Sequence, residues 1–327
     1  MLLKALKSNS TYSFLLIPFF AIALWIKSFM QPLLYPFYPG EDAMLLYQPV
    51  NALLGKSPVA SHVLALIFII VLSFLVLRIK LQYSFIRERT ILPSFIFILI
   101  TSGMHELHSI HPVYFAALFF ILAIDRIFDS YEKEIIHANA FESGILLAIG
   151  SLFYFNLVFF FPFLWIGFII LKPKVNWREF ILTTLGFAFP WLGAGAYYGA
   201  TGRISELQST IQANFQSHPW FLKNNLSMQI YMGYLALLIL LASILILSQY
   251  DGKKISTRKY FKAFFWIFLI CVILMVASPA VSQEIIMLMA IPLTYLISNY
   301  FLCIKRPIFG EIFLFILLAG VIFLQFI

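Results

Sequence analysis

Apolar residues fill most of the chain in long runs that short polar connections separate. A transmembrane helix needs about 20 consecutive apolar residues, and runs near that length recur along the whole sequence. They predict helices at residues 12–29, 59–79, 91–104, 112–128, 141–153, 156–171, 180–200, 226–248, 263–279, 284–303 and 308–326. The pattern therefore predicts an all-α, multi-pass transmembrane bundle of about eleven helices.

The run at 141–171 is continuous, and a turn near Asn156 that divides it decides the orientation of every later loop. Cytoplasmic loops of membrane proteins are enriched in Lys and Arg. With the turn, 18 of the 22 lysines and arginines fall on the same side as the N-terminus. Without it, the cations at 172–178 and 253–262 move to the other side. The charges favour eleven spans and a cytoplasmic N-terminus.

The composition supports this prediction. Hydrophobic residues make up 62% of the chain and charged residues 11%, with a mean hydropathy of +0.95. Soluble domains carry about 25% charged residues, so a water-soluble fold is excluded. In a membrane protein the net charge of +8 records orientation, so no nucleic-acid partner is expected. The chain also lacks the repeats that are typical of secondary transporters.

Two adjacent acids stand in the first predicted outer loop. Pro39 and Gly40 precede Glu41 and Asp42, and an amphipathic segment follows. This order predicts a turn and then a short helix at the membrane interface. Acids at a helix start stabilise it by accepting hydrogen bonds from free N–H groups, and the same acids can instead serve chemistry. Both interpretations remain open here.

The second predicted outer loop concentrates ionisable side chains. His105, Glu106, His108 and His111 lie within seven residues. Histidines three residues apart point to neighbouring faces of a helical turn, which would suit a divalent metal together with an acid. The alternatives are a polar turn at the interface and a role in substrate binding or acid-base chemistry.

The outer loop at 201–225 carries Arg203, His218 and Lys223. The two cations run against the positive-inside trend. They would suit a phosphate or another anion at the outer leaflet, and ordinary contacts with lipid headgroups explain them as well.

This layout resembles the GT-C superfamily of glycosyltransferases, membrane enzymes that use polyprenyl-phosphate-linked sugars. Those enzymes share a seven-helix module, an acidic motif in the first outer loop and often another acid between helices three and four. Glu41-Asp42 and Glu106 match these places. The segment 111–120 looks like the start of the family's fourth helix, and 155–202 is similar to its helices six and seven. The chain also resembles an uncharacterised family of Bacteroidota inner-membrane proteins.

The resemblance implies a GT-C-like module at residues 1–205, a four-helix extension at 206–327, and sugar transfer at the periplasmic face of the bacterial inner membrane. It implies membrane lipids and a polyprenyl-phosphate-linked sugar as partners. The implied catalytic residues are Glu41, Asp42 and Glu106, and the implied substrate-binding residues are His105, His108, His111, Arg203, His218 and Lys223. The second interpretation is a non-catalytic subunit of an assembly or secretion complex, which binds lipid or other membrane proteins.

Overall fold

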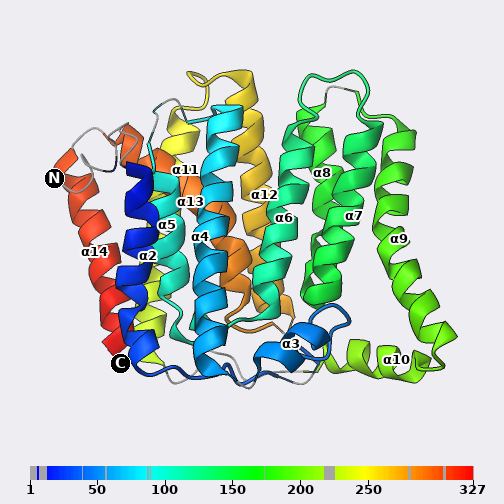
Figure 1. The fold of residues 1–327 in the computed structure, drawn as a ribbon. Coiled ribbons are helices and arrows are strands. Elements are labelled where there is room, and N and C mark those ends of the chain that lie inside the picture. Colours follow the sequence, from blue (N-terminus) through cyan, green and yellow to red (C-terminus); the bar gives the residue numbers. More distant parts are fainter. Residues whose placement is uncertain are drawn as a thin grey trace.

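The computed structural model describes residues 6, 13–38, 40–55, 57–86, 88, 90–172, 174–216, 225–278, 281–304 and 307–326. The described residues form helices and connections, with no strand among them, and the longer helices lie side by side (Figure 1). This confirms the prediction of an all-α fold. In the described part of the chain, six helices are long and apolar enough to cross a membrane, and three shorter helices are also apolar. The fold is a polytopic helical bundle.

A helix lies at the position of every predicted apolar run. These helices are α2 (Ser13–Met30), α4 (Pro58–Tyr83), α5 (Leu92–Ser102), α6 (Pro112–Phe128), α7 (His137–Phe153), α8 (Phe161–Leu171), α9 (Trp177–Ala200), α11 (Leu226–Ser248), α12 (Ile255–Ala277), α13 (Ile285–Cys303) and α14 (Pro307–Phe326). The largest boundary error is at α12, which begins eight residues before the predicted start at 263. Its first two turns carry Arg258, Lys259 and Lys262, so these cations lie on a helix and not in a loop.

Shorter helices gather at the end of the bundle that lies at the bottom of Figure 1, called here the α3 end. They include α3 (Gln48–Leu54), α10 (Ile204–Ala213) and the 3-10 helices η1 (His105–His108) and η2 (Phe155–Phe160). The chain turns within η2, which contains Asn156. The predicted interfacial helix is present as α3 but starts only at Gln48, because residues 41–47 form turns.

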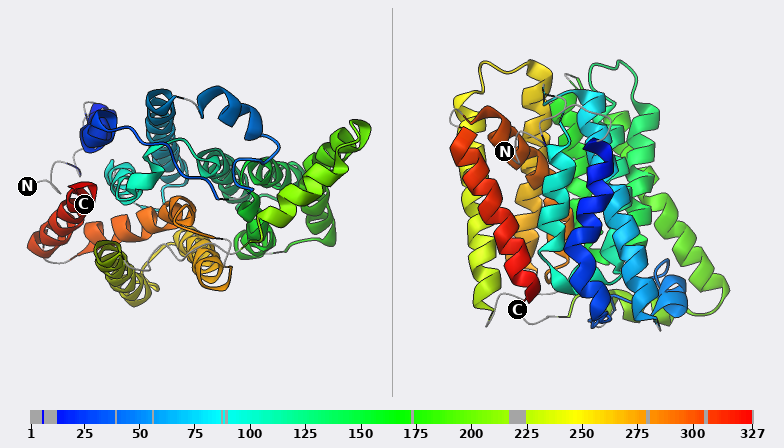
Figure 2. Two further views of the ribbon diagram at one scale, coloured as in Figure 1. Left: turned by 90° about the horizontal axis from the view of Figure 1, so that it is seen from below. Right: turned by 60° about the vertical axis from the view of Figure 1, so that its left-hand side comes forward.

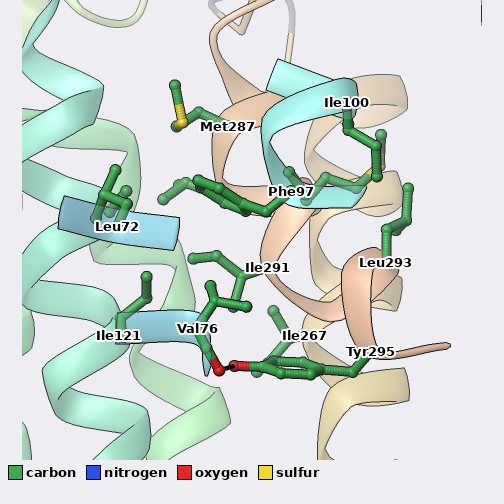
Figure 3. Packing of buried hydrophobic residues seen from close by; sticks show 14 of the residues in the cluster. Leu72, Val76, Phe97, Ile100, Ile121, Ile267, Met287, Ile291, Leu293 and Tyr295 are labelled. Atoms are coloured by element: carbon green, nitrogen blue, oxygen red, sulfur yellow. Dashed lines mark hydrogen bonds between the residues drawn. The ribbon is translucent and has the colours of Figure 1, made fainter. Parts of the chain in front are cut away.

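Helix α13 forms the centre of the bundle. It packs against α5, α6, α11 and α12, and 94% of its apolar window is buried. Figure 3 shows Ile291 of α13 near Leu72 and Val76 of α4 and Phe97 of α5, and Leu293 on the side of Ile100. The Tyr295 hydroxyl donates to the Val76 carbonyl oxygen at 2.8 Å. Helices from both sides of residue 205 thus share one core.

Helix α9 lies at one edge of the molecule, and α10 continues from it (Figure 2). It packs closely against α7, where a side chain on Gly144 would meet the backbone of residues 183–187 and one on Gly186 would meet the backbone of Phe141. Only 17% of the apolar window of α9 is buried. Most of its surface therefore faces away from the bundle.

Candidate functional site

Glu41 and Asp42 have separate environments although they are adjacent. The Glu41 side chain is 4% exposed, and its Oε2 accepts a hydrogen bond from the Tyr38 backbone N–H at 2.9 Å. Asp42 is half-buried, and its Oδ2 accepts from the Asn51 side-chain amide at 3.3 Å. Neither carboxylate caps α3, whose N-cap residue is Tyr47. The helix-capping interpretation of these acids is therefore wrong, because the helix begins six residues after Asp42.

Glu41 faces the imidazole of His111, which directly precedes α6. The two are 3.7 Å apart, measured from Glu41 Oε2 to His111 Nε2. His111 Nδ1 accepts a hydrogen bond from the Val113 N–H at 3.1 Å, so the ring proton lies on Nε2 and faces the carboxylate. The rings of Tyr35 and Phe37 pack against the imidazole, with centroids at 4.7 Å and 5.8 Å. These aromatic rings hold the histidine in place.

A second acid, Glu284, joins this group from the turn before α13. It is fully buried, and its Oε1 accepts from the Tyr154 hydroxyl and from the Ser282 N–H, both at 2.9 Å. The Asn156 amide donates to the Tyr154 oxygen at 3.1 Å. Burial, followed by the charge of Glu41, raises the pKa of Glu284 above its ordinary value of 4.5.

Glu41, His111, Tyr154, Asn156 and Glu284 are called here the buried polar cluster. Several of its polar atoms could form further hydrogen bonds. Within the described part of the chain, Glu41 Oε1, His111 Nε2, Asn156 Oδ1 and Glu284 Oε2 are buried and have no hydrogen-bond partner. Such groups are destabilising in a purely structural core, so their presence marks a candidate site.

A cavity of about 220 Å³ opens at the α3 end beside the buried polar cluster. Tyr35 and Phe37 line it, and the same two rings contact His111. Asn51, the partner of Asp42, lines it as well. Asp42 thus accepts a hydrogen bond from a side chain that lines the cavity, whereas Glu41 belongs to the buried polar cluster.

The other two histidines of the second predicted outer loop turn toward α2. His108 stacks on Trp25 with ring centroids 4.2 Å apart, and its Nδ1 accepts from the Ser28 hydroxyl. Its Nε2 lies 3.2 Å from the Ser102 carbonyl oxygen. Burial lowers the pKa of His108, so it is neutral. His105 lies beside it, at 3.4 Å from Ser28. The histidines thus form two groups, and only His111 joins Glu41.

Arg203 does not reach the cavity. It is exposed at the start of α10, where it bonds the Tyr197 hydroxyl at 3.0 Å and lies 3.7 Å from Glu206. Asn214, which follows α10, donates to the Gly40 carbonyl oxygen at 3.1 Å. The ten residues of α10 place Arg203 about 15 Å from that contact along the helix axis.

Three predicted site residues cannot be placed by their side chains. His218 and Lys223 lie outside the described residues, and of Glu106 only the backbone, in η1, is described. Among the residues that are described, no group of three or more His, Cys, Asp and Glu side chains is arranged to hold a metal ion.

Glu284 and Tyr154 were not predicted as site residues. Glu284 stands directly beside an apolar run, and this position was the only feature of the sequence that could have marked it as a candidate site residue. A 130-residue separation between the two hides their contact from the sequence.

Comparison with known proteins gives one match. No curated protein and no solved structure matches the chain. A family model, described as a family of unknown function (DUF6427), matches residues 35–327, which include every residue of the buried polar cluster. The chain belongs to this DUF6427 family.

Proposed function

We propose that this protein is a multi-pass protein of the bacterial inner membrane that transfers a sugar from a polyprenyl-phosphate donor at the α3 end. In this proposal eleven helices span the membrane and the α3 end faces the periplasm. The distribution of Lys and Arg supports this orientation, because most of them lie toward the opposite end. The GT-C resemblance of the acidic first loop supports the reaction class.

The observation that carries the proposal is the hydrogen bond to Asp42 from Asn51, a residue that lines the 220 Å³ cavity. A half-buried carboxylate that a neighbouring amide orients is suited to act as a general base. Asp42 accepts the proton of an acceptor hydroxyl while that oxygen bonds the anomeric carbon. The bond between this carbon and the phosphate oxygen breaks, and polyprenyl phosphate leaves with the electron pair.

The buried polar cluster has a supporting part in this scheme. Tyr35 and Phe37, two rings that line the cavity, contact His111, which in turn faces Glu41. These contacts position the loop that carries Asp42. Glu106, which stands in η1 next to His105, is proposed as a second acid at the site on the basis of the GT-C resemblance.

The test compares glycans in a deletion strain that expresses the wild type, Asp42→Asn or Glu206→Gln. Loss of a general base lowers a rate by about 10²–10⁴-fold, so Asp42→Asn should abolish the glycan that the deletion removes. Glu206 is an exposed acid at the same end and its variant should restore the glycan. Full glycosylation by Asp42→Asn at wild-type protein levels would contradict the proposal.

A second candidate is a non-catalytic subunit of a membrane complex. The outward surface of α9 supports it: Gly195 has no atom within 4 Å of a built Cβ, and Gly199 follows one helical turn later. Two glycines at this spacing allow close approach of another transmembrane helix. Gly195→Leu should then release a copurifying membrane protein, while Asp42→Asn retains it. Retention of the partner by Gly195→Leu would argue against this candidate.

A further inference from the structure

A small cavity lies between α11 and α12 at the end of the bundle opposite the α3 end. Its volume is about 200 Å³. Three cations line it: Lys253 from the connecting loop, and Arg258 and Lys262 from the first two turns of α12. No acidic residue is among its lining residues. The neighbouring cavity of about 500 Å³ shares Lys253 but also contains Glu88, so it is the less positive of the two.

Within the described residues, these cations have no carboxylate partner. No Asp or Glu among the described residues lies within ion-pair distance of Lys253, Arg258 or Lys262. Lys253 Nζ donates to the side-chain oxygen of Asn299, a residue of the neighbouring cavity, at 3.1 Å, and the buried Asn299 Nδ2 has no acceptor in the described part of the chain. The buried Arg258 Nε also has no acceptor there. The 200 Å³ cavity therefore holds three positive charges and the free Arg258 Nε–H donor, which an anion would satisfy.

Aromatic rings orient two of the cations. The Arg258 guanidinium lies 5.1 Å from the centroid of the Tyr250 ring, and Lys253 Nζ lies 5.5 Å from that of Phe261. Cation-π contacts of this kind hold a charged group while its donors stay available. The amino-terminal turns of the 23-residue α12 add the positive end of the helix dipole.

The remaining walls are apolar. Leu247, Phe265 and Leu296 line the cavity beside the cations. Leu247 is 71% exposed and Phe265 is 48% exposed on the outer surface of the bundle, where lipid tails lie in a membrane protein. The cavity thus joins a basic, donor-rich part to a hydrophobic surface at the end of a helix pair. A phosphate that carries a hydrocarbon chain matches both parts, whereas a soluble phosphate uses only the first.

We propose that this cavity binds the phosphate headgroup of an anionic membrane lipid, with Arg258 and Lys262 as the principal ligands and the acyl chain along Leu247 and Phe265. Arg258 presents its Nε and terminal amines to the phosphate oxygens, and Lys262 supplies a point charge. The site is distinct from the cavity at the α3 end. Its occupancy does not depend on the proposed glycosyl transfer.

The test uses the full-length protein in detergent, with native mass spectrometry to count bound lipids at equal concentrations of phosphatidylglycerol and phosphatidylcholine. Arg258→Gln/Lys262→Gln removes one Arg and one Lys from the cavity. Lys174→Gln/Arg178→Gln removes the same charges from exposed positions at the same end and is the matched control. Inorganic phosphate and glycerol phosphate are added as soluble competitors.

Wild-type protein should retain phosphatidylglycerol in preference to phosphatidylcholine. The cavity variant should lose this preference by about 30-fold, and the control by less than about twofold, because two basic groups near a lipid phosphate together contribute about that factor. Arg258→Lys keeps the charge but removes the planar guanidinium donors. It should lose less of the preference for phosphatidylglycerol than the double variant does. An equal loss of lipid preference in the cavity and control variants would contradict the proposed site. Displacement of the lipid by millimolar inorganic phosphate would overturn the assignment to a lipid.

Discussion

Lys172 and Glu179 form an ion pair in which both side chains are buried. They are 7% and 1% exposed, and the Lys172 ammonium donates to Glu179 Oε1. Glu179 also accepts from the Asn176 N–H at 2.8 Å, which completes a capping box at the start of α9. Loss of one partner leaves a buried charge without a counter-ion, which costs about 3–5 kcal/mol. We therefore predict that Glu179→Gln lowers the free energy of unfolding by about 3 kcal/mol in detergent titrations.

The chain offers a matched control for this prediction. Arg126 and Glu142 form an ion pair at 3.1 Å whose side chains are about half exposed. Exposed pairs contribute about 0–1 kcal/mol, so Glu142→Gln should change the free energy of unfolding by less than about 1 kcal/mol. Equal effects of the two substitutions would show that burial does not set the strength of the Lys172–Glu179 pair.

Glu284 predicts a pH dependence of stability. Its pKa in the folded protein lies above the ordinary value of 4.5, because of burial and then the charge of Glu41. The folded state therefore binds the proton more tightly than the unfolded state. The resulting stabilisation is complete below pH 4.5 and is lost as the pH rises through the raised pKa. Thermal unfolding in detergent should occur at lower temperature as the pH rises from 4.5 into the neutral range.

Glu284→Gln removes this titration and should flatten the pH dependence over that range. Glu206→Gln is the control. Glu206 is 58% exposed, so its substitution should not change how the unfolding temperature depends on pH. A wild-type slope in Glu284→Gln would assign the titration to another group.

The acids of the first predicted outer loop could be identified as candidates from the sequence, but their separate environments could not. The resemblance pointed to Glu41 and Asp42 together, but the turns at 41–47 place Glu41 in the buried polar cluster and Asp42 against Asn51. The three histidines likewise divide between α2 and Glu41. Such divisions follow from tertiary packing, which residue spacing alone does not carry.

At the scale of helices, the contact between α7 and α9 depends on two glycines. A valine at Gly186 would meet the Phe141 backbone oxygen, which belongs to α7 and cannot move alone. Overpacking of this kind costs about 1–3 kcal/mol, and a backbone contact places it near the upper value. We predict that Gly186→Val lowers the free energy of unfolding by about 3 kcal/mol, measured in the same detergent titrations.

Gly195→Val is the control on the same helix. A Cβ at Gly195 meets nothing within 4 Å, so the substitution should leave stability within about 1 kcal/mol of the wild type. Similar destabilisation by both variants would mean that valine acts through helix propensity and not through the α7 contact.

The positions of the long helices could be predicted because apolar length is a strong signal, whereas the ends could not. Helix α12 starts at Ile255 because cations at a helix end remain helical while their side chains reach polar surroundings. Helix α10 occupies a connecting segment that carried no apolar run long enough to predict a span. Its role, to bring Asn214 against Gly40, depends on a contact between residues 174 positions apart.

At the scale of the whole molecule, the central helix α13 shows that the segments 1–205 and 206–327 pack together. The resemblance covers residues 1–205, yet α13 comes from the remainder and packs against α5 and α6. Removal of the last four helices would expose the faces of α5 and α6 that α13 covers. The first seven helices therefore depend on the last four to cover their apolar faces.

The number of spans decides which side of the membrane each end faces, and the turn at η2 is the critical point. Helices α7 and α8 lie on either side of that turn. With the turn, exposed Glu134 before α7 and exposed Lys174 after α8 lie on the same side of the membrane. Ser209, exposed on α10, lies on the other. If the run crossed the membrane once, Glu134 and Lys174 would lie on opposite sides.

Single cysteines distinguish these arrangements after Cys271 and Cys303 are replaced by Ser. We predict that a membrane-impermeant maleimide labels Ser209→Cys in intact spheroplasts and labels Glu134→Cys and Lys174→Cys only after lysis. The physical basis is the excess of Lys and Arg at the end that carries residues 172–178 and 253–262, which keeps that end in the cytoplasm. Labelling of Glu134→Cys and Lys174→Cys from opposite sides would show that the chain does not reverse its direction across the membrane at η2. It would also move the basic cavity between α11 and α12 to the periplasmic side, because every later loop would change sides with it.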